Sequence, residues 1–180
     1  MTGPTHRPDE PASPATSSPP CYAAEFPGYF GETADGPSPE TIERLNALLE
    51  AERAGARVLA ILRDGLDPRS LARAVLERLQ KDEGVNAVVL YKTIQRLGGV
   101  ASHDTGAFVH KTLAIDGLAA RLRFVNKGQA WVVRKIEELL PMVSDEIVRA
   151  MLDEMRQSHI DNIAACDALL AQDLDDSAAN

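Results

Sequence analysis

Four stretches of the sequence that repeat apolar residues at helical spacing each contain a polar residue near the middle. These residues are Glu52 in the first stretch, Glu83 with Asn86 in the second, Gln129 in the third and His159 in the fourth. A carboxylate buried among apolar side chains is costly unless it is paired or acts as a ligand. Polar groups at a similar depth on four helices therefore predict one shared polar site in the core.

The helices that position these residues are marked by apolar spacing and by start and stop signals. Ser38-Pro39 predicts the first start, Asp67-Pro68 the second and Ser144-Asp145-Glu146 the last. Gly98-Gly99 and Pro141 predict the ends of the second and third helices. The apolar stripe of the second helix begins at Leu71 and that of the fourth at Ile147. The expected helices span residues 38–64, 67–97, 116–139 and 144–172.

Four such helices without paired strand patterns predict an all-α four-helix bundle. The first-to-second and third-to-fourth links are only a few residues long, so we expect these two pairs to be antiparallel hairpins. The link between the second and third helices, residues 98–115, contains about eighteen residues. An extended link of that length can recross a bundle about 42 Å long. We therefore expect one long crossover between the second and third helices; a short helix around residues 108–113 would reduce the reach of this link.

Five segments carry a family resemblance: LLEAERAGAR at 48–57, KDE at 81–83, RLGG at 96–99, NKGQAWVVRK at 126–135 and MRQSHIDNI at 155–163. With these segments the sequence resembles the ferritin-like superfamily over roughly residues 38–170. It looks closest to a little-characterised bacterial branch with an N-terminal aromatic arm. Ferritin-like di-iron proteins place one Glu on each of two helices and Glu-x-x-His on each of the other two. The resemblance implies a ferritin-like bundle in which these positions face one another.

The ligand motif of these proteins is only partly present here. The positions that match it are Glu52, Glu83 and His159. Asn86 stands where the motif has His, Gln129 where it has the Glu of the third helix, and Arg156 where it has the Glu of the fourth. The resemblance therefore implies a degenerate di-iron motif with too few carboxylates to balance two metal cations.

Three hypotheses follow for this site. In the first, no metal is bound, Arg156 pairs with one of the two glutamates, and Gln129 and Asn86 complete a core polar network that holds the helix register. In the second, the three matching residues bind a single iron or manganese ion, since two carboxylates and an imidazole suit these metals. In the third, the register differs, and Asp82 or Glu154 is a ligand.

The N-terminal region, residues 1–37, differs in composition from the rest of the chain. Nine of the eleven prolines precede residue 40, and residues 1–20 repeat no apolar face. The aromatic residues of the following segment are Tyr22, Phe26, Tyr29 and Phe30. Such a cluster is expected either to pack on its own bundle or to bind a partner protein. We divide the chain into a Pro-rich arm (1–37), a bundle (38–172) and an acidic tail (173–180).

Composition excludes several classes of protein. A net charge of −8 argues against a nucleic-acid binder, and two cysteines exclude a disulfide-rich scaffold. No apolar run approaches the roughly 18 residues of a membrane span, and no secretory signal is visible, so we expect a cytoplasmic protein.

Together these features predict a non-catalytic accessory or structural protein without a cofactor. We expect it to bind a partner protein or to form a homodimer through its arm and helix faces. The alternative is an iron- or manganese-dependent oxidase or oxygenase-like protein with a mononuclear site.

Overall fold

The computed structural model describes residues 37–178, with side chains as far as residue 172. The elements are α1 (Pro39–Asp64), α2 (Leu71–Arg96), α3 (Phe108–Leu113), α4 (Leu118–Leu139), the short 3-10 helix η2 (Leu140–Met142) and α5 (Glu146–Ala178). No strand occurs between residues 37 and 178, and none of these helices combines the length and apolar character that crossing a bilayer requires. The predicted arm residues Tyr22, Phe26, Tyr29 and Phe30 lie outside the described residues.

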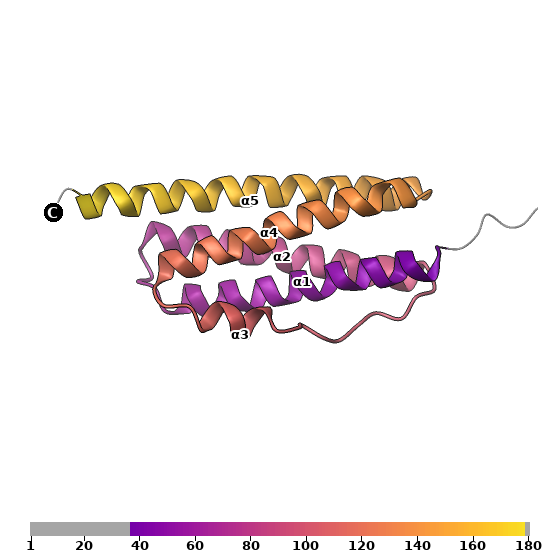
Figure 1. Ribbon diagram of the computed structural model, residues 1–180, viewed down its shortest axis with the longest axis horizontal. Coiled ribbons are helices and arrows are strands. Elements are labelled where there is room, and N and C mark those ends of the chain that lie inside the picture. Colours follow the sequence, from indigo (N-terminus) through magenta and orange to yellow (C-terminus); the bar gives the residue numbers. More distant parts are fainter. Residues whose placement is uncertain (1–36, 179–180) are drawn as a thin grey trace, which may run out of the picture. The chain divides into compact units, whose positions relative to one another are not determined.

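The long helices α1, α2, α4 and α5 lie side by side and form a bundle (Figure 1). Contacts join α1 to α2 and α4 to α5, and the two pairs meet through α1 with α4 and α2 with α5. The segment between α2 and α4 returns along the bundle, so that these two helices run in the same direction (Figure 1). The predicted all-α bundle with one long crossover is confirmed.

Side-chain caps start α1, α2 and α5, and the start of α2 differs from the prediction. The Ser38 hydroxyl accepts a hydrogen bond from the backbone N–H of Thr41 at 3.1 Å, as the first start signal predicts. We expected α2 to begin at Asp67-Pro68, but its cap is Ser70. The Asp67 carboxylate instead accepts the N–H two residues on, at 2.7 Å, and this closes a local turn. At the start of α5, the Asp145 carboxylate accepts two backbone N–H groups.

The crossover is held against α1 by polar side chains of that helix. The Asn46 amide donates to the Val100 carbonyl at 2.9 Å and accepts from the Ser102 N–H at 2.7 Å. The Arg53 guanidinium donates to the carbonyl of Ser102. These bonds satisfy backbone groups of a long loop and fix where α3 meets α1.

The apolar core consists of two clusters, one toward each end of the bundle. The first contains Leu45, Leu49, Leu90, Ile94, Ile136 and Leu152, and the second contains Leu59, Leu62, Leu76, Leu79, Leu122 and Leu169. On each helix, the predicted polar residues lie in sequence between members of the two clusters. A polar layer therefore separates the two apolar cores.

Two residues assigned to the buried stripes are exposed instead. Leu71 is 58% exposed and Ile147 is 70% exposed, whereas the neighbouring Val148 is buried. The predicted stripe on α5 advanced from Ile147 to His159 in three steps of four residues, and such steps drift around a helix of 3.6 residues per turn. The buried positions of α5 alternate steps of four and three residues, which keeps them on one face.

Two glycines on facing helices provide a test of how tightly α1 packs on α2. A Cβ added at Gly55 of α1 would clash with a carboxylate oxygen of Glu83, whereas a Cβ at Gly84 of α2 meets nothing within 4 Å. We predict that Gly55→Ala lowers the free energy of unfolding by about 1–3 kcal/mol. Gly84→Ala should raise it by about 0.5–1 kcal/mol, because alanine loses less backbone entropy in a helix. Urea denaturation measures both changes.

The cause of the Gly55 effect is checked in a second background. If the added methyl group acts by displacing Glu83, the cost of Gly55→Ala shrinks when Glu83 is replaced by Ala. Equal stabilities of the Gly55→Ala and Gly84→Ala proteins would contradict the close packing of α1 on α2.

Candidate functional site

Four helices each contribute to the polar layer at the middle of the bundle. Glu52 comes from α1, Glu83 from α2, Gln129 from α4 and His159 from α5, and none of the four is more than 3% exposed. Asn86, one turn after Glu83 on α2, is half-buried. The structure therefore brings five of the six predicted site residues to one level of the bundle.

A hydrogen bond between α1 and α5 forms the centre of this layer. His159 Nε2 lies 2.7 Å from Glu52 Oε1, and both side chains are completely buried. The second carboxylate oxygen of Glu52 accepts from the Asn86 amide at 3.2 Å. His159 Nδ1 lies 3.4 Å from Gln129 Oε1. A single carboxylate thus links α1 to α2 and α5, and the imidazole extends the network to α4.

The second carboxyl group, that of Glu83, is neutralised in a different way. Burial raises its pKa well above the ordinary value, and the charge of Glu52, together with a hydrogen bond to it, raises the pKa further. Glu83 therefore keeps its proton to a higher pH than an ordinary glutamate, and it can donate that proton to the Glu52 carboxylate. Only the missing side chain at Gly55 leaves room for Glu83 at this place.

Arg156 does not join the predicted network. Its side chain is 32% exposed and lies 3.8 Å from Glu137 of α4 and 3.6 Å from Asp153 of its own helix. Its long side chain reaches these exposed carboxylates, where a guanidinium stays partly hydrated. The pairing of Arg156 with a core glutamate is therefore wrong, and the described residues bring no arginine into the layer.

The shifted-register hypothesis is not supported by where its two residues lie. Asp82 and Glu154 line a surface groove together with Arg78 and other polar residues of α2 and α5. Glu154 is exposed and Asp82 is half-buried. Neither residue belongs to the buried layer.

The donor set does not fit a two-iron centre. The layer offers two carboxylates, one imidazole and two amides, whereas di-iron carboxylate sites on bundles of this kind use four glutamates and two histidines. Glu52 and His159 are hydrogen-bonded to each other. Among residues 37–172, no group of three His, Cys, Asp or Glu side chains is placed to hold a metal ion. A single ion on Glu52, Glu83 and His159 would require the Glu52–His159 bond to open.

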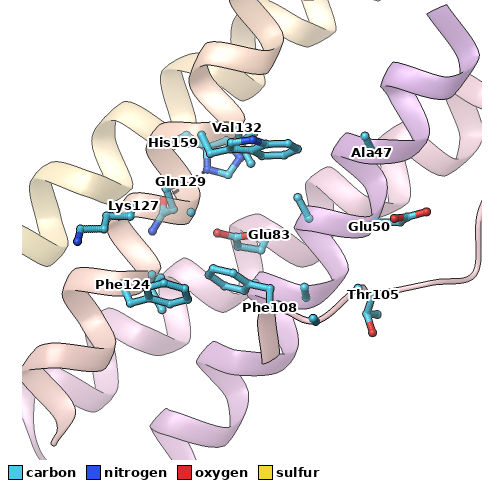
Figure 2. A pocket seen from close by; sticks show the side chains of 18 residues that line it. Ala47, Glu50, Glu83, Thr105, Phe108, Phe124, Lys127, Gln129, Val132 and His159 are labelled. Atoms are coloured by element: carbon cyan, nitrogen blue, oxygen red, sulfur yellow. Dashed lines mark hydrogen bonds between the residues drawn. The ribbon is translucent and has the colours of Figure 1, made fainter. Parts of the chain in front are cut away.

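The sequence did not reveal a cavity of about 370 Å³ beside the polar layer. Figure 2 shows Glu83, Gln129 and His159 on its wall, with Phe108 and Phe124 nearby. The only signal in the sequence was a set of small residues on α1 and Gly128 on α4, which leave space between the helices.

Comparison with known proteins places these features in a family. The family model for a domain of unknown function (DUF6306) matches residues 39–168. A crystal structure of ferritin-like, diiron-carboxylate proteins from Bacillus anthracis str. Ames has a TM-score of 0.63 and 18% identity, and the match covers 73% of this chain and 95% of that chain. The bacterioferritin-related protein from Bacteroides fragilis, a dodecameric thioferritin, has a TM-score of 0.67 and 13% identity, with coverage of 78% and 89%. These structures confirm the predicted ferritin-like fold. No match was found among curated proteins.

The raised pKa of Glu83 predicts how stability depends on pH. A carboxyl whose pKa is higher in the folded than in the unfolded chain stabilises the fold below its unfolded pKa. That contribution to stability is lost as the pH rises through the pKa that the carboxyl has in the folded state. Glu83→Gln keeps a neutral donor at this position, so we predict that its melting temperature exceeds that of the wild type. The difference should be larger at about pH 8 than at about pH 5, as measured by circular dichroism.

Glu77→Gln is the matched control, since Glu77 lies on α2 and is exposed. Its melting temperature should follow that of the wild type at each pH. A constant difference between Glu83→Gln and wild type across this range would show that Glu83 does not hold the proton.

Proposed function

The chain belongs to the family defined by the domain of unknown function DUF6306, and we propose that it is a non-catalytic, metal-free ferritin-like protein that associates with itself. The observation that carries this proposal is the 2.7 Å hydrogen bond between His159 and Glu52, both of which are completely buried. Two residues at metal-ligand positions of the motif are hydrogen-bonded to each other instead of being free to bind a metal ion. The layer is therefore a degenerate site with a structural role.

Electrostatics supports this proposal. A metal ion in such a layer normally neutralises the buried carboxylates. Here the Glu52 carboxylate accepts hydrogen bonds from His159 and Asn86, and the raised pKa of Glu83 favours its neutral form. Gln129 stands where the motif has a glutamate, which removes a negative charge that two cations would need. Asn86 stands where the motif has a histidine, which removes a neutral ligand. The layer then works as a hydrogen-bonded network that links four helices.

Self-association is the second part of the proposal. One of the similar structures is described as dodecameric. In this chain, α2 exposes three valines at helical spacing on one face: Val85 (53%), Val88 (52%) and Val89 (36%). Residues three and four positions apart lie on the same side of a helix. Two copies related by a two-fold axis would bury this face against itself.

The role of the aromatic arm stays a separate proposal. Tyr22, Phe26, Tyr29 and Phe30 are proposed to dock on a partner protein or on a second copy of this chain, because four aromatics in ten residues favour burial.

Metal content tests the first part of the proposal. We predict that protein purified without chelator contains far less than one iron or manganese ion per chain, and that EDTA leaves its melting temperature unchanged. His159→Ala should not alter the metal content, but it should lower the free energy of unfolding by about 3–5 kcal/mol because the buried Glu52 carboxylate loses its imidazole partner. Elemental analysis, anaerobic Fe(II) titration and urea denaturation provide these readouts.

The positive control restores ligands that the motif lacks. Asn86→His combined with Gln129→Glu adds an imidazole and a carboxylate at the level of Glu52 and Glu83, and this variant should bind Fe(II) more strongly than the wild type. Stoichiometric metal in the wild type that is lost in His159→Ala would contradict the proposal and favour the oxidase or oxygenase alternative.

Sedimentation velocity tests self-association. We predict that the wild type sediments as a dimer or larger assembly and that Val88→Lys shifts it toward the monomer, because a lysine would be buried in the apolar contact. Val100→Lys is the control, since Val100 is 85% exposed and lies in the crossover, beyond the C-terminal end of α2. A monomeric wild type, or an assembly that Val88→Lys leaves intact, would exclude the α2 face as the interface.

A further inference from the structure

The cavity beside the polar layer has the shape and lining of a small-molecule site. Its volume of about 370 Å³ lies within the range of ligand-binding pockets. The wall on the α1 side contains Glu50 and the small residues Ala47, Ala51, Ala54 and Gly55. The aromatic part of the lining consists of Phe108, Phe124 and Trp131. A planar apolar ring matches such a lining, since aromatic faces stack on one another.

The two phenylalanines form a preorganised wall. The rings of Phe108 and Phe124 are stacked, with their centroids 5.3 Å apart and their planes inclined by 16°. Gly128 allows this arrangement, because a Cβ there would lie 2.7 Å from the ring of Phe108. This wall joins α3 to α4, so the crossover contributes directly to the cavity.

One polar group of the cavity wall lacks a partner. Gln129 is 3% exposed, and its amide oxygen faces His159. Its amide nitrogen is buried, and no hydrogen-bond partner for it is present in the described part of the chain. Buried donors of this kind are rare and are normally satisfied by a protein group, a water molecule or a ligand. A ligand oxygen seated at this wall would supply the missing acceptor (Figure 2).

The charges around Gln129 decide which kind of oxygen fits. A ligand carboxylate at Gln129 would be buried near the Glu52 carboxylate, because Gln129 and Glu52 contact the same imidazole, that of His159. Glu50 adds another carboxylate to the lining, and the neutral form of Glu83 offers no opposite charge. The lining contains one cation, Lys127, and its side chain is exposed at the edge of the cavity. Like charges in a buried site repel each other strongly. A neutral carbonyl oxygen is therefore preferred over a carboxylate.

We propose that this cavity binds a small neutral aromatic molecule whose carbonyl oxygen accepts a hydrogen bond from the side-chain amide of Gln129. The ring lies among Trp131, Phe108 and Phe124, and the small residues of α1 provide the space. Nothing in this proposal depends on whether the chain associates with itself. A wild type that bound metal would contradict the proposed function and would still allow the cavity to be tested.

The experiment uses three probes of similar size and the full chain. Acetophenone carries a neutral carbonyl, toluene lacks an acceptor and benzoate carries a charge. Trp131 is the only tryptophan, so one indole N–H signal in a ¹⁵N–¹H NMR spectrum reports on the cavity wall. We expect this signal to shift in a saturable way as probe is added. Acetophenone should bind at least about fivefold more tightly than toluene, which is the gain that one buried hydrogen bond allows. Benzoate should bind more weakly than acetophenone.

Two variants separate the hydrogen bond from the space. Gln129→Leu should remove the preference for acetophenone over toluene while toluene still binds. Ala51→Leu fills the cavity from α1 and should abolish binding of both, and it keeps the test valid if Gln129→Leu does not fold. Equal affinity for acetophenone and toluene in the wild type, absence of a saturable shift with every probe, or unchanged binding in Ala51→Leu would overturn the proposal.

Discussion

The rest of this structure depends on a carboxylate and an imidazole that are both removed from water. Glu52 and His159 have no exposed surface, so neither can be hydrated, and each must find its partner within the protein. Their hydrogen bond fixes α1 and α5 at one relative height. Asn86 and Gln129 then meet the remaining oxygen and nitrogen atoms. In this way the four long helices are aligned by polar contacts that leucine packing alone does not specify.

The same layer shows how a bundle tolerates acids in its core. Glu83 lies beside Glu52 because Gly55 leaves room for it, and the proton it retains turns repulsion between two carboxylates into a donor–acceptor contact. On either side, leucines and isoleucines form separate apolar clusters that supply most of the burial. Stability and alignment therefore come from different residues: the apolar clusters hold the helices together, and the polar layer sets their register.

Much of the fold could be predicted from local signals. Helix periods, the Ser38 cap and the long link before α4 are encoded within short segments, so the bundle and its crossover followed from the sequence. The level of Glu52, Glu83, Gln129 and His159 was also predictable, because each polar residue interrupts an apolar stripe at the same depth. The direction in which the Arg156 side chain points was not predictable, because it depends on Glu137 of another helix. The cavity also escaped prediction, since α1, α4 and the crossover form its walls together.

The division of the core into two apolar clusters has a consequence for how such a protein can change in length. The polar layer at the centre sets the alignment of the helices. Each end of the bundle therefore requires only that its own apolar side chains pack against one another. Whole turns added to or removed from α1 and α2 together, or from α4 and α5 together, would leave Glu52 and His159 facing each other. Diversity in size among proteins built this way is therefore expected at the ends of the bundle, while the middle keeps its dimensions.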